Sequence, residues 1–158
     1  MKIGVISDTH GDVRAASKAI DILDRLQVSL TIHCGDVGLE TMSAFDGRPM
    51  HFVCGNMDEP ARLREAIVRP EHKFHERLGA LKLEGCSVAL LHGHDVKLLY
   101  HAIHSGHWDL VCRGHTHEFS RTREGRTLVL NPGAISRSDH PSLAVVELPS
   151  LEVTEIPL

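Results

Sequence analysis

The strongest constraint on the fold is a repeated order of strand and helix in the first 67 residues. Three short apolar segments, rich in β-branched residues, are typical of buried strands: 2–7, 29–34 and 50–54. Helix patterns lie between and after them. Because parallel strands need a crossover connection, this order predicts a parallel sheet covered by helices.

The first of these helices has the clearest pattern. Asp12 can cap its start, and its apolar residues form a single stripe: Val13, Ala16, Ala19, Ile20 and Leu23. A short helix is predicted near 39–45. Asp58 and Pro60 indicate the start of a third helix, which runs through Ile67.

The second half of the sequence has a different pattern, in which predicted strands follow one another. The segments are strands within 73–85, 86–92, 109–113, 142–148 and 152–156, a helix over 95–105, and a hairpin over 119–131 with its turn at Glu124 and Gly125. This order predicts a mostly antiparallel meander. Together the halves favour an α/β fold of two mixed β-sheets with helices outside, formed by residues 1–158 as a single domain.

Composition excludes several classes of protein. Apolar residues make up 42% of the chain and charged residues 24%, so neither disorder nor a membrane-spanning protein is expected. The sequence turns polar too early for a signal peptide. A net charge of −4 without a basic stripe argues against nucleic acid as the main partner. No membrane partner is expected, and a homo-oligomer is left open.

The cysteines indicate a reducing compartment. Cys34, Cys54, Cys86 and Cys112 form no C-x-x-C pair, and we interpret them as small, buried, reduced residues. Disulfides are rare in the cytosol, so this usage predicts a cytoplasmic protein. Histidine is the unusual residue, with 13 in 158 positions.

Metal-binding side chains stand where the predicted strands end. They are Asp8, His10, Asp36, Asn56, His92, His115 and His117. The carboxyl ends of strands in an open α/β sheet border one crevice, so these scattered residues are expected to meet. His115 and His117 are two residues apart, which places both rings on one side of an extended backbone, and Gly114 lets the chain approach closely. Single GD or GN pairs are common in turns, but the ordered set favours a metal site.

This ordered set resembles the motifs of a known family. D-x-H, G-D, G-N, H-G-H and G-H-T-H, followed by LNPGAIS at 130–136, are similar to the calcineurin-like metallophosphoesterase superfamily and its small single-domain prokaryotic phosphodiesterases. The resemblance implies a four-layer αββα sandwich. It also implies two metal sites, one formed by Asp8, His10, Asp36 and His117, and the other by Asp36, Asn56, His92 and His115, with Asp36 bridging. The implied reaction is in-line attack on a small phosphate ester by a hydroxide that bridges two divalent metals.

The donor types agree with transition-metal ions. Each implied site mixes carboxylate or amide oxygens with imidazole nitrogens, a set that suits Mn²⁺, Ni²⁺, Co²⁺, Fe²⁺ or Zn²⁺ better than Mg²⁺ or Ca²⁺. We expect Mn²⁺. Asp36 and Asn56 are the expected catalytic residues together with His94, which either touches the substrate or packs behind the ligands. Arg113 and Arg137 flank the crevice, where either could bind phosphate or remain a surface charge.

Several neighbouring residues have structural interpretations. His33 lies within a strand and is expected to be a buried, hydrogen-bonded histidine. His101 and His104 lie one turn apart near a helix end, where solvated imidazoles interact favourably with the helix dipole. Asp12 and Asp58 are interpreted as helix caps.

One position departs from the family pattern. Many members have histidine after G-N, and this sequence has Met57, so the usual acid partner is absent. That difference argues against a phosphoprotein phosphatase and agrees with the small phosphodiesterase branch. The alternatives are a phosphomonoesterase, a nucleotide-polyphosphate hydrolase with the same dimetal site, and a non-catalytic scaffold of the retromer-subunit type. In the scaffold branch, the position that matches His10 is not histidine.

Overall fold

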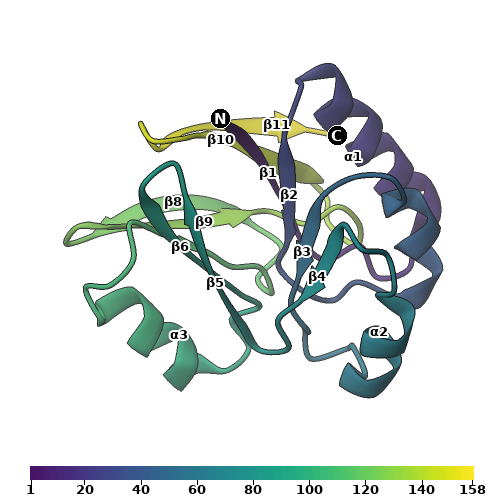
Figure 1. Cartoon of the computed structure of the whole chain (residues 1–158), viewed down its shortest axis with the longest axis horizontal. Coiled ribbons are helices and arrows are strands. Elements are labelled where there is room, and N and C mark those ends of the chain that lie inside the picture. Colours follow the sequence, from purple (N-terminus) through teal and green to yellow (C-terminus); the bar gives the residue numbers. More distant parts are fainter.

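Two β-sheets face each other in the computed structural model, which describes residues 1–158 (Figure 1). The first sheet has the strand order β11-β10-β1-β2-β3-β4. Its strands are β1 (Lys2–Ile6), β2 (Leu30–His33), β3 (Met50–Phe52), β4 (His72–Phe74), β10 (Ser142–Glu147) and β11 (Glu152–Pro157). As predicted, β1, β2 and β3 are parallel to one another.

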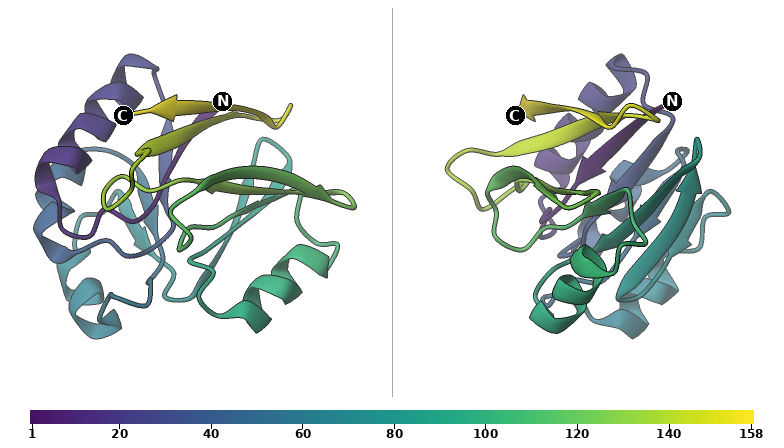
Figure 2. Two further views of the ribbon diagram at one scale, coloured as in Figure 1. Left: turned by 180° about the vertical axis from the view of Figure 1, so that it is seen from behind. Right: turned by 90° about the vertical axis from the view of Figure 1, so that its left-hand side faces the viewer.

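The second sheet has the strand order β5-β6-β7-β9-β8. Its strands are β5 (Leu78–Leu83), β6 (Cys86–Leu91), β7 (Leu110–Cys112), β8 (Phe119–Glu124) and β9 (Thr127–Pro132). Four helices complete the fold: α1 (Val13–Arg25), the 3-10 helix η1 (Leu39–Phe45), α2 (Pro60–Ala66) and α3 (Val96–His104). Helices α1 and α2 cover the outer face of the first sheet, and α3 covers the second (Figure 2). The chain therefore has the four-layer αββα architecture.

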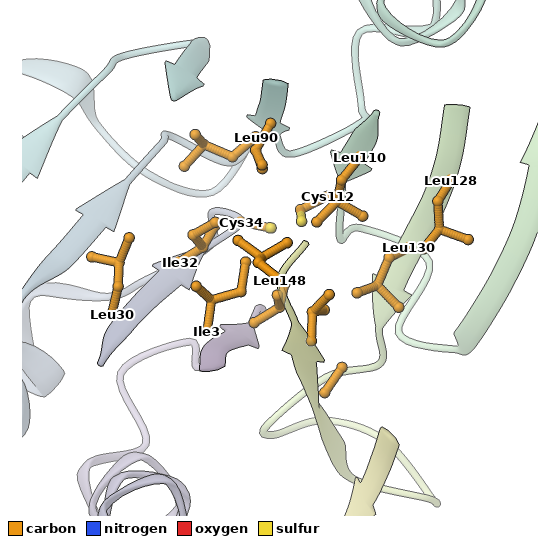
Figure 3. Close-up of a cluster of buried hydrophobic side chains, with 14 of the residues drawn as sticks. Ile3, Leu30, Ile32, Cys34, Leu90, Leu110, Cys112, Leu128, Leu130 and Leu148 are labelled. Atoms are coloured by element: carbon orange, nitrogen blue, oxygen red, sulfur yellow. The ribbon is translucent and has the colours of Figure 1, made fainter. Parts of the chain in front are cut away.

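Apolar side chains fill the space between the two sheets. Ile3 of β1 lies in this layer with Leu90 of β6, Leu110 of β7 and Leu130 of β9 (Figure 3). Val5 of β1 belongs to the same cluster. All five side chains are fully buried, so this layer excludes water between the central strands of the two sheets. Burying a side chain of this size stabilises the fold by about 1.5–3 kcal/mol. Packing in this layer therefore fixes the position of one sheet relative to the other, and with it the distance between their strand ends.

The first helix follows the predicted pattern with one difference. Asp12 caps α1, because its side chain accepts a hydrogen bond from the Ala15 N–H at 2.9 Å. The stripe is buried except for Val13, which is 42% exposed. Gly4 lies under the helix, where a Cβ would come within 2.8 Å of Leu23. The glycine in the middle of β1 thus lets α1 approach the sheet.

The predicted meander in the second half is wrong in its central strands. β6, β7 and β9 are parallel, and only the pairs β5–β6 and β8–β9 of this sheet are antiparallel. The reason is α3, which returns the chain to the starting end of β6 before β7 begins.

Two boundaries in this half also differ from the prediction. The single strand predicted within 73–85 is divided, with β4 in the first sheet and β5 in the second. Because Glu124 pairs with Thr127, the hairpin turn consists of Gly125 and Arg126, one residue later than predicted.

Two further predictions concern membrane-spanning helices and the cysteine thiols. No helix has both the length and the apolar character needed to cross a membrane. All four cysteines are buried and none forms a disulfide, as predicted.

Candidate metal centre

The seven candidate ligand side chains lie in the loops that follow five strands. Asp8 and His10 follow β1, Asp36 follows β2 and Asn56 follows β3. The second sheet contributes the others: His92 follows β6, and His115 and His117 follow β7. Both sheets thus place the carboxyl ends of their parallel strands at one edge of the sandwich; the sequence predicts this arrangement for the first sheet only.

One half of the centre consists of Asp8, His10 and His117. Asp8 Oδ1 lies 3.1 Å from His117 Nε2 and 3.7 Å from His10 Nε2. The two imidazole Nε2 atoms are 3.3 Å apart. These three atoms come from loops 107 residues apart in sequence, and they could bind one ion together.

The other half consists of Asp36, His92 and Asn56. His92 Nε2 lies 3.4 Å from Asp36 Oδ2 and 3.1 Å from Asn56 Oδ1. Asp36 Oδ2 is also 3.9 Å from His10 Nε2, so this carboxylate stands between the two halves. The Asp8 carboxylate lies close to the ligand atoms of His10 and His117 and also to those of Asp36 and His92, so it too is near both halves.

Both carboxylates are held by backbone N–H groups. Asp8 Oδ2 accepts a hydrogen bond from the His115 N–H at 3.1 Å, and Asp36 Oδ1 accepts one from the Met57 N–H at 2.8 Å. Asp8 Oδ1 is buried and has no hydrogen-bond donor. A buried charged oxygen without a donor is costly unless a cation binds it.

Two imidazoles are oriented through their outer nitrogens. His92 Nδ1 lies 2.8 Å from the Cys34 carbonyl, and His117 Nδ1 lies 3.0 Å from the Arg137 carbonyl. A carbonyl only accepts, so each Nδ1 donates, and in the neutral ring the Nε2 lone pair faces the carboxylates. Lone pairs that converge in this way need a proton or a metal ion between them.

The charges of the centre act on its own pKa values. Burial alone would lower the pKa of His92, but the hydrogen bond and charge of Asp36 outweigh it and raise that pKa. Burial would likewise raise the pKa of Asp36, but hydrogen bonds from His92 and the Met57 N–H hold it below its usual value. Burial lowers the pKa of His10, which favours the neutral ring that a metal ion requires.

The backbone around the centre is strained. Asp8, His10, Asp36, His115 and His117 all have φ between 46° and 74°, in the left-handed region that non-glycine residues seldom adopt. Such conformations cost about 1–3 kcal/mol each and cluster at functional sites. A Cβ on Gly114 would overlap Ser7 and come within 2.7 Å of Asp8 Oδ2, so the glycine before His115 permits this approach.

His115 and His94 lie at the rim of the centre. The His115 ring is exposed, and its centroid is 5.0 Å from that of His92. It does not join the ligand atoms gathered around Asp8 and Asp36. The exposed His94 ring lies 5.4 Å from His92 and 6.3 Å from His115. His94 therefore borders the centre from the solvent side and does not pack behind the ligands.

The three histidines with structural interpretations lie where the sequence predicts them. His33 is fully buried, with Nε2 2.9 Å from the Thr9 hydroxyl and Nδ1 accepting from the Gly35 N–H at 3.3 Å. His101 and His104 are exposed in the last turn of α3.

The predicted cap role of Asp58 is wrong. Its carboxylate accepts hydrogen bonds from the N–H groups of Val37, Gly38 and Gly55 at 2.9–3.3 Å. Glu59 occupies the position before α2 and makes no side-chain cap. Asp58 therefore joins the loop that carries Asp36 to the loop that carries Asn56.

Asn131 is a positioning residue that the sequence did not reveal. Its side-chain amide donates to the Gly114 carbonyl at 3.0 Å and to the Thr116 hydroxyl at 2.9 Å. These bonds fix the loop between β7 and β8, which carries His115 and His117. The only sequence signal is its place in LNPGAIS, next to a strand end.

The chain is similar to known proteins both in sequence and in fold. The model of the calcineurin-like phosphoesterase superfamily domain matches residues 1–150. A phosphodiesterase of Methanocaldococcus jannaschii is 32% identical, over 100% of this chain and 99% of its own. A probable metallophosphoesterase of Methanothermobacter thermautotrophicus is 33% identical, over 94% of this chain and 86% of its own. The solved structure of an archaeal phosphodiesterase superposes with a TM-score of 0.90 at 31% identity, and the match covers 100% of both chains.

Proposed function

Because the chain belongs to the calcineurin-like phosphoesterase superfamily, we propose that residues 1–158 form one domain that hydrolyses small phosphodiesters. The chain is a metal-dependent phosphoester hydrolase, as its family and its full-length relatives indicate. The observation that carries the proposal is the convergence of two buried carboxylates and three imidazole nitrogens at the strand ends. Asp8 Oδ1 lacks any donor there, as expected of a ligand to a cation.

The proposed ligands divide between two ions. Asp8, His10, Asp36 and His117 would hold one ion, and Asp36, Asn56, His92 and His115 the other. The position of Asp36 Oδ2 between His10 and His92 supports its bridging role. The His115 ring, which lies at the rim with its centroid 5.0 Å from that of His92, would have to turn toward the centre to bind the second ion. The mixed oxygen and nitrogen donors favour Mn²⁺, with Ni²⁺, Co²⁺, Fe²⁺ and Zn²⁺ as alternatives. Such ions supply a nucleophile at neutral pH and positive charge for the phosphate.

The remaining residues orient the substrate and move protons. Asn56 is exposed, and its amide N–H₂ group is free to donate to a phosphate oxygen while Oδ1 faces His92. His94 is the proposed proton donor to the departing alkoxide, because Met57 has no transferable proton. Burial, helped by the charges of His92 and His115, lowers the pKa of His94. A protonated His94 is therefore a stronger acid than a free imidazolium.

The proposal also covers the cellular compartment of the protein and its binding partner. Four buried cysteine thiols without a disulfide support a cytoplasmic location. The proposed partner is a small phosphate ester, and the net charge of −4 argues against nucleic acid as the main partner.

A substrate panel tests the function. Nitrophenyl phosphodiesters, nitrophenyl phosphate and a nucleoside triphosphate are each offered to metal-stripped protein with Mn²⁺, Ni²⁺, Co²⁺, Zn²⁺ or Mg²⁺ added. We expect the highest kcat/KM for a diester with a transition ion. Preference for the monoester or the triphosphate would overturn the diesterase assignment, and no turnover of any substrate would favour a scaffold.

A further inference from the structure

Two hollows adjoin beside the metal centre. The smaller one, of about 150 Å³, is called here the phosphate hollow; it is lined by His10, Asp36, Gly38, Met57, Asp58 and Arg137. The larger one, of about 250 Å³, is called here the Met57 hollow. It shares Gly38, Met57 and Asp58 with the first and continues to Leu39, Leu63 and Arg62. The two hollows therefore form a cleft that begins at two proposed metal ligands and ends at α2.

Arg137 supplies the free positive charge of the phosphate hollow. The arginine ion pairs of the chain are made by Arg48, Arg64, Arg69, Arg77 and Arg126, so the guanidinium of Arg137 is uncommitted.

The backbone of Arg137 is fixed relative to the centre. Its carbonyl accepts the hydrogen bond from His117 Nδ1 at 3.0 Å. A guanidinium presents several N–H groups in a planar fork that matches phosphate oxygens. The residue is thus held where it can bind a phosphate next to His10.

Met57 forms the boundary between the two hollows. Its side chain is 66% exposed, while its N–H donates a hydrogen bond to Asp36 Oδ1 at 2.8 Å. The backbone of Met57 is therefore held beside the proposed bridging ligand, and its side chain lines both hollows. Sulfur makes favourable contacts with aromatic rings, worth about 0.3–1.5 kcal/mol in general.

The Met57 hollow has the size and charge for a neutral ring. The half-buried Leu39 adds apolar wall beside Met57, and the volume of about 250 Å³ exceeds the roughly 150 Å³ that benzene needs. Arg62 is offset by Glu40 and Glu59 on the same lining, so a second phosphate gains little there.

We propose that the substrate lies across both hollows, with its phosphate against Arg137 and a planar aromatic ester group packed on Met57. This inference rests on the proposed function and specifies its substrate class. Met57 and Arg137 are then specificity-determining residues, and neither one transfers a proton.

Competitive inhibition by phosphonates tests the proposal, because a phosphonate cannot be hydrolysed. The inhibitors are methylphosphonate and naphthylmethylphosphonate, measured against a nitrophenyl diester on the Mn²⁺-loaded protein. In the unaltered protein, the naphthyl compound should bind about tenfold more tightly. Met57→Ala should remove that advantage and leave the inhibition constant of methylphosphonate unchanged. Val96→Ala is the matched control, since Val96 is 72% exposed on α3.

The role of the Arg137 guanidinium is tested with the same two phosphonate inhibitors. Arg137→Gln should weaken both phosphonates by about tenfold and leave their ratio unchanged. Glutamine retains the carbonyl that holds His117 and bears the same left-handed backbone strain as arginine. Arg14→Gln, in α1, is the matched control.

Two results would overturn the inference. One is an equal affinity of the two phosphonates for the unaltered protein, or an aromatic advantage that survives Met57→Ala. The other is unchanged phosphonate binding in Arg137→Gln. Either result can occur in a protein that hydrolyses diesters well, whereas absence of diester turnover refutes the proposed function itself.

Discussion

His33 makes the folded protein sensitive to acid. Burial, with the charge of His92 adding to it, lowers the pKa of the His33 ring from 6.5 to about 3. Between those two pH values the unfolded chain binds a proton at this position and the folded chain does not. The folded state therefore loses stability as the pH falls from 6.5 toward 3, and keeps it above 6.5.

The size of the loss follows from the pKa difference. At about pH 5 the medium is about 1.5 units below the unfolded pKa and still well above the folded one. Since one unit corresponds to about 1.36 kcal/mol, His33 should lower the free energy of unfolding by about 2 kcal/mol between about pH 7.5 and about pH 5.

Urea unfolding of metal-stripped protein at these two pH values measures the effect. The comparison is with His33→Asn, which retains an acceptor for the Gly35 N–H but cannot titrate in this range. The loss of stability on acidification should be about 2 kcal/mol smaller in this variant. His101→Asn, at an exposed site on α3, is the control and should match the unaltered protein. If His33→Asn loses as much stability as the unaltered protein, the account of His33 is wrong.

Two predictions concern the reaction. Asp36→Asn should lower kcat/KM for a diester by more than about 100-fold, because one carboxylate serves both proposed ions, whereas His101→Ala should stay within about twofold; similar losses in the two variants would refute the site assignment. Because Met57 cannot protonate a leaving group and a positioned acid contributes about 10² to 10⁴ in rate, turnover should depend steeply on the pKa of the leaving group. His94→Ala should steepen that plot and Met57→His should flatten it; a plot that is equally flat in the unaltered protein and in His94→Ala, with chemistry rate-limiting, would show that an acid other than His94 acts.

The parallel strands β1, β2 and β3 could be predicted from local patterns because each is short, largely buried and followed by a clear helix signal. The stripe on α1 and the cap at Asp12 are properties of neighbouring residues, and the structure confirms them apart from the exposure of Val13. The order of strands in the second sheet depends on where α3 returns the chain, which periodicity does not encode.

The candidate site could be predicted as a set, since its members all follow strands. The position and orientation of each side chain could not be predicted from the sequence. His115 stands at the rim because its main-chain N–H, and not its ring, is directed at Asp8. Asp58 has the position of a helix cap in the sequence, but its carboxylate binds the Gly55 N–H of its own loop and, across the site, the N–H groups of Val37 and Gly38 in the loop after β2. Such long-range hydrogen bonds leave no pattern in the chain.

Metal dependence of diester hydrolysis is the most direct test of the central claim. Protein stripped with a chelator and then freed of it is titrated with Mn²⁺ while the hydrolysis of a nitrophenyl diester is recorded. The account predicts no turnover without metal and a rise to a plateau at two ions per chain. Full activity in the metal-free protein would contradict the account.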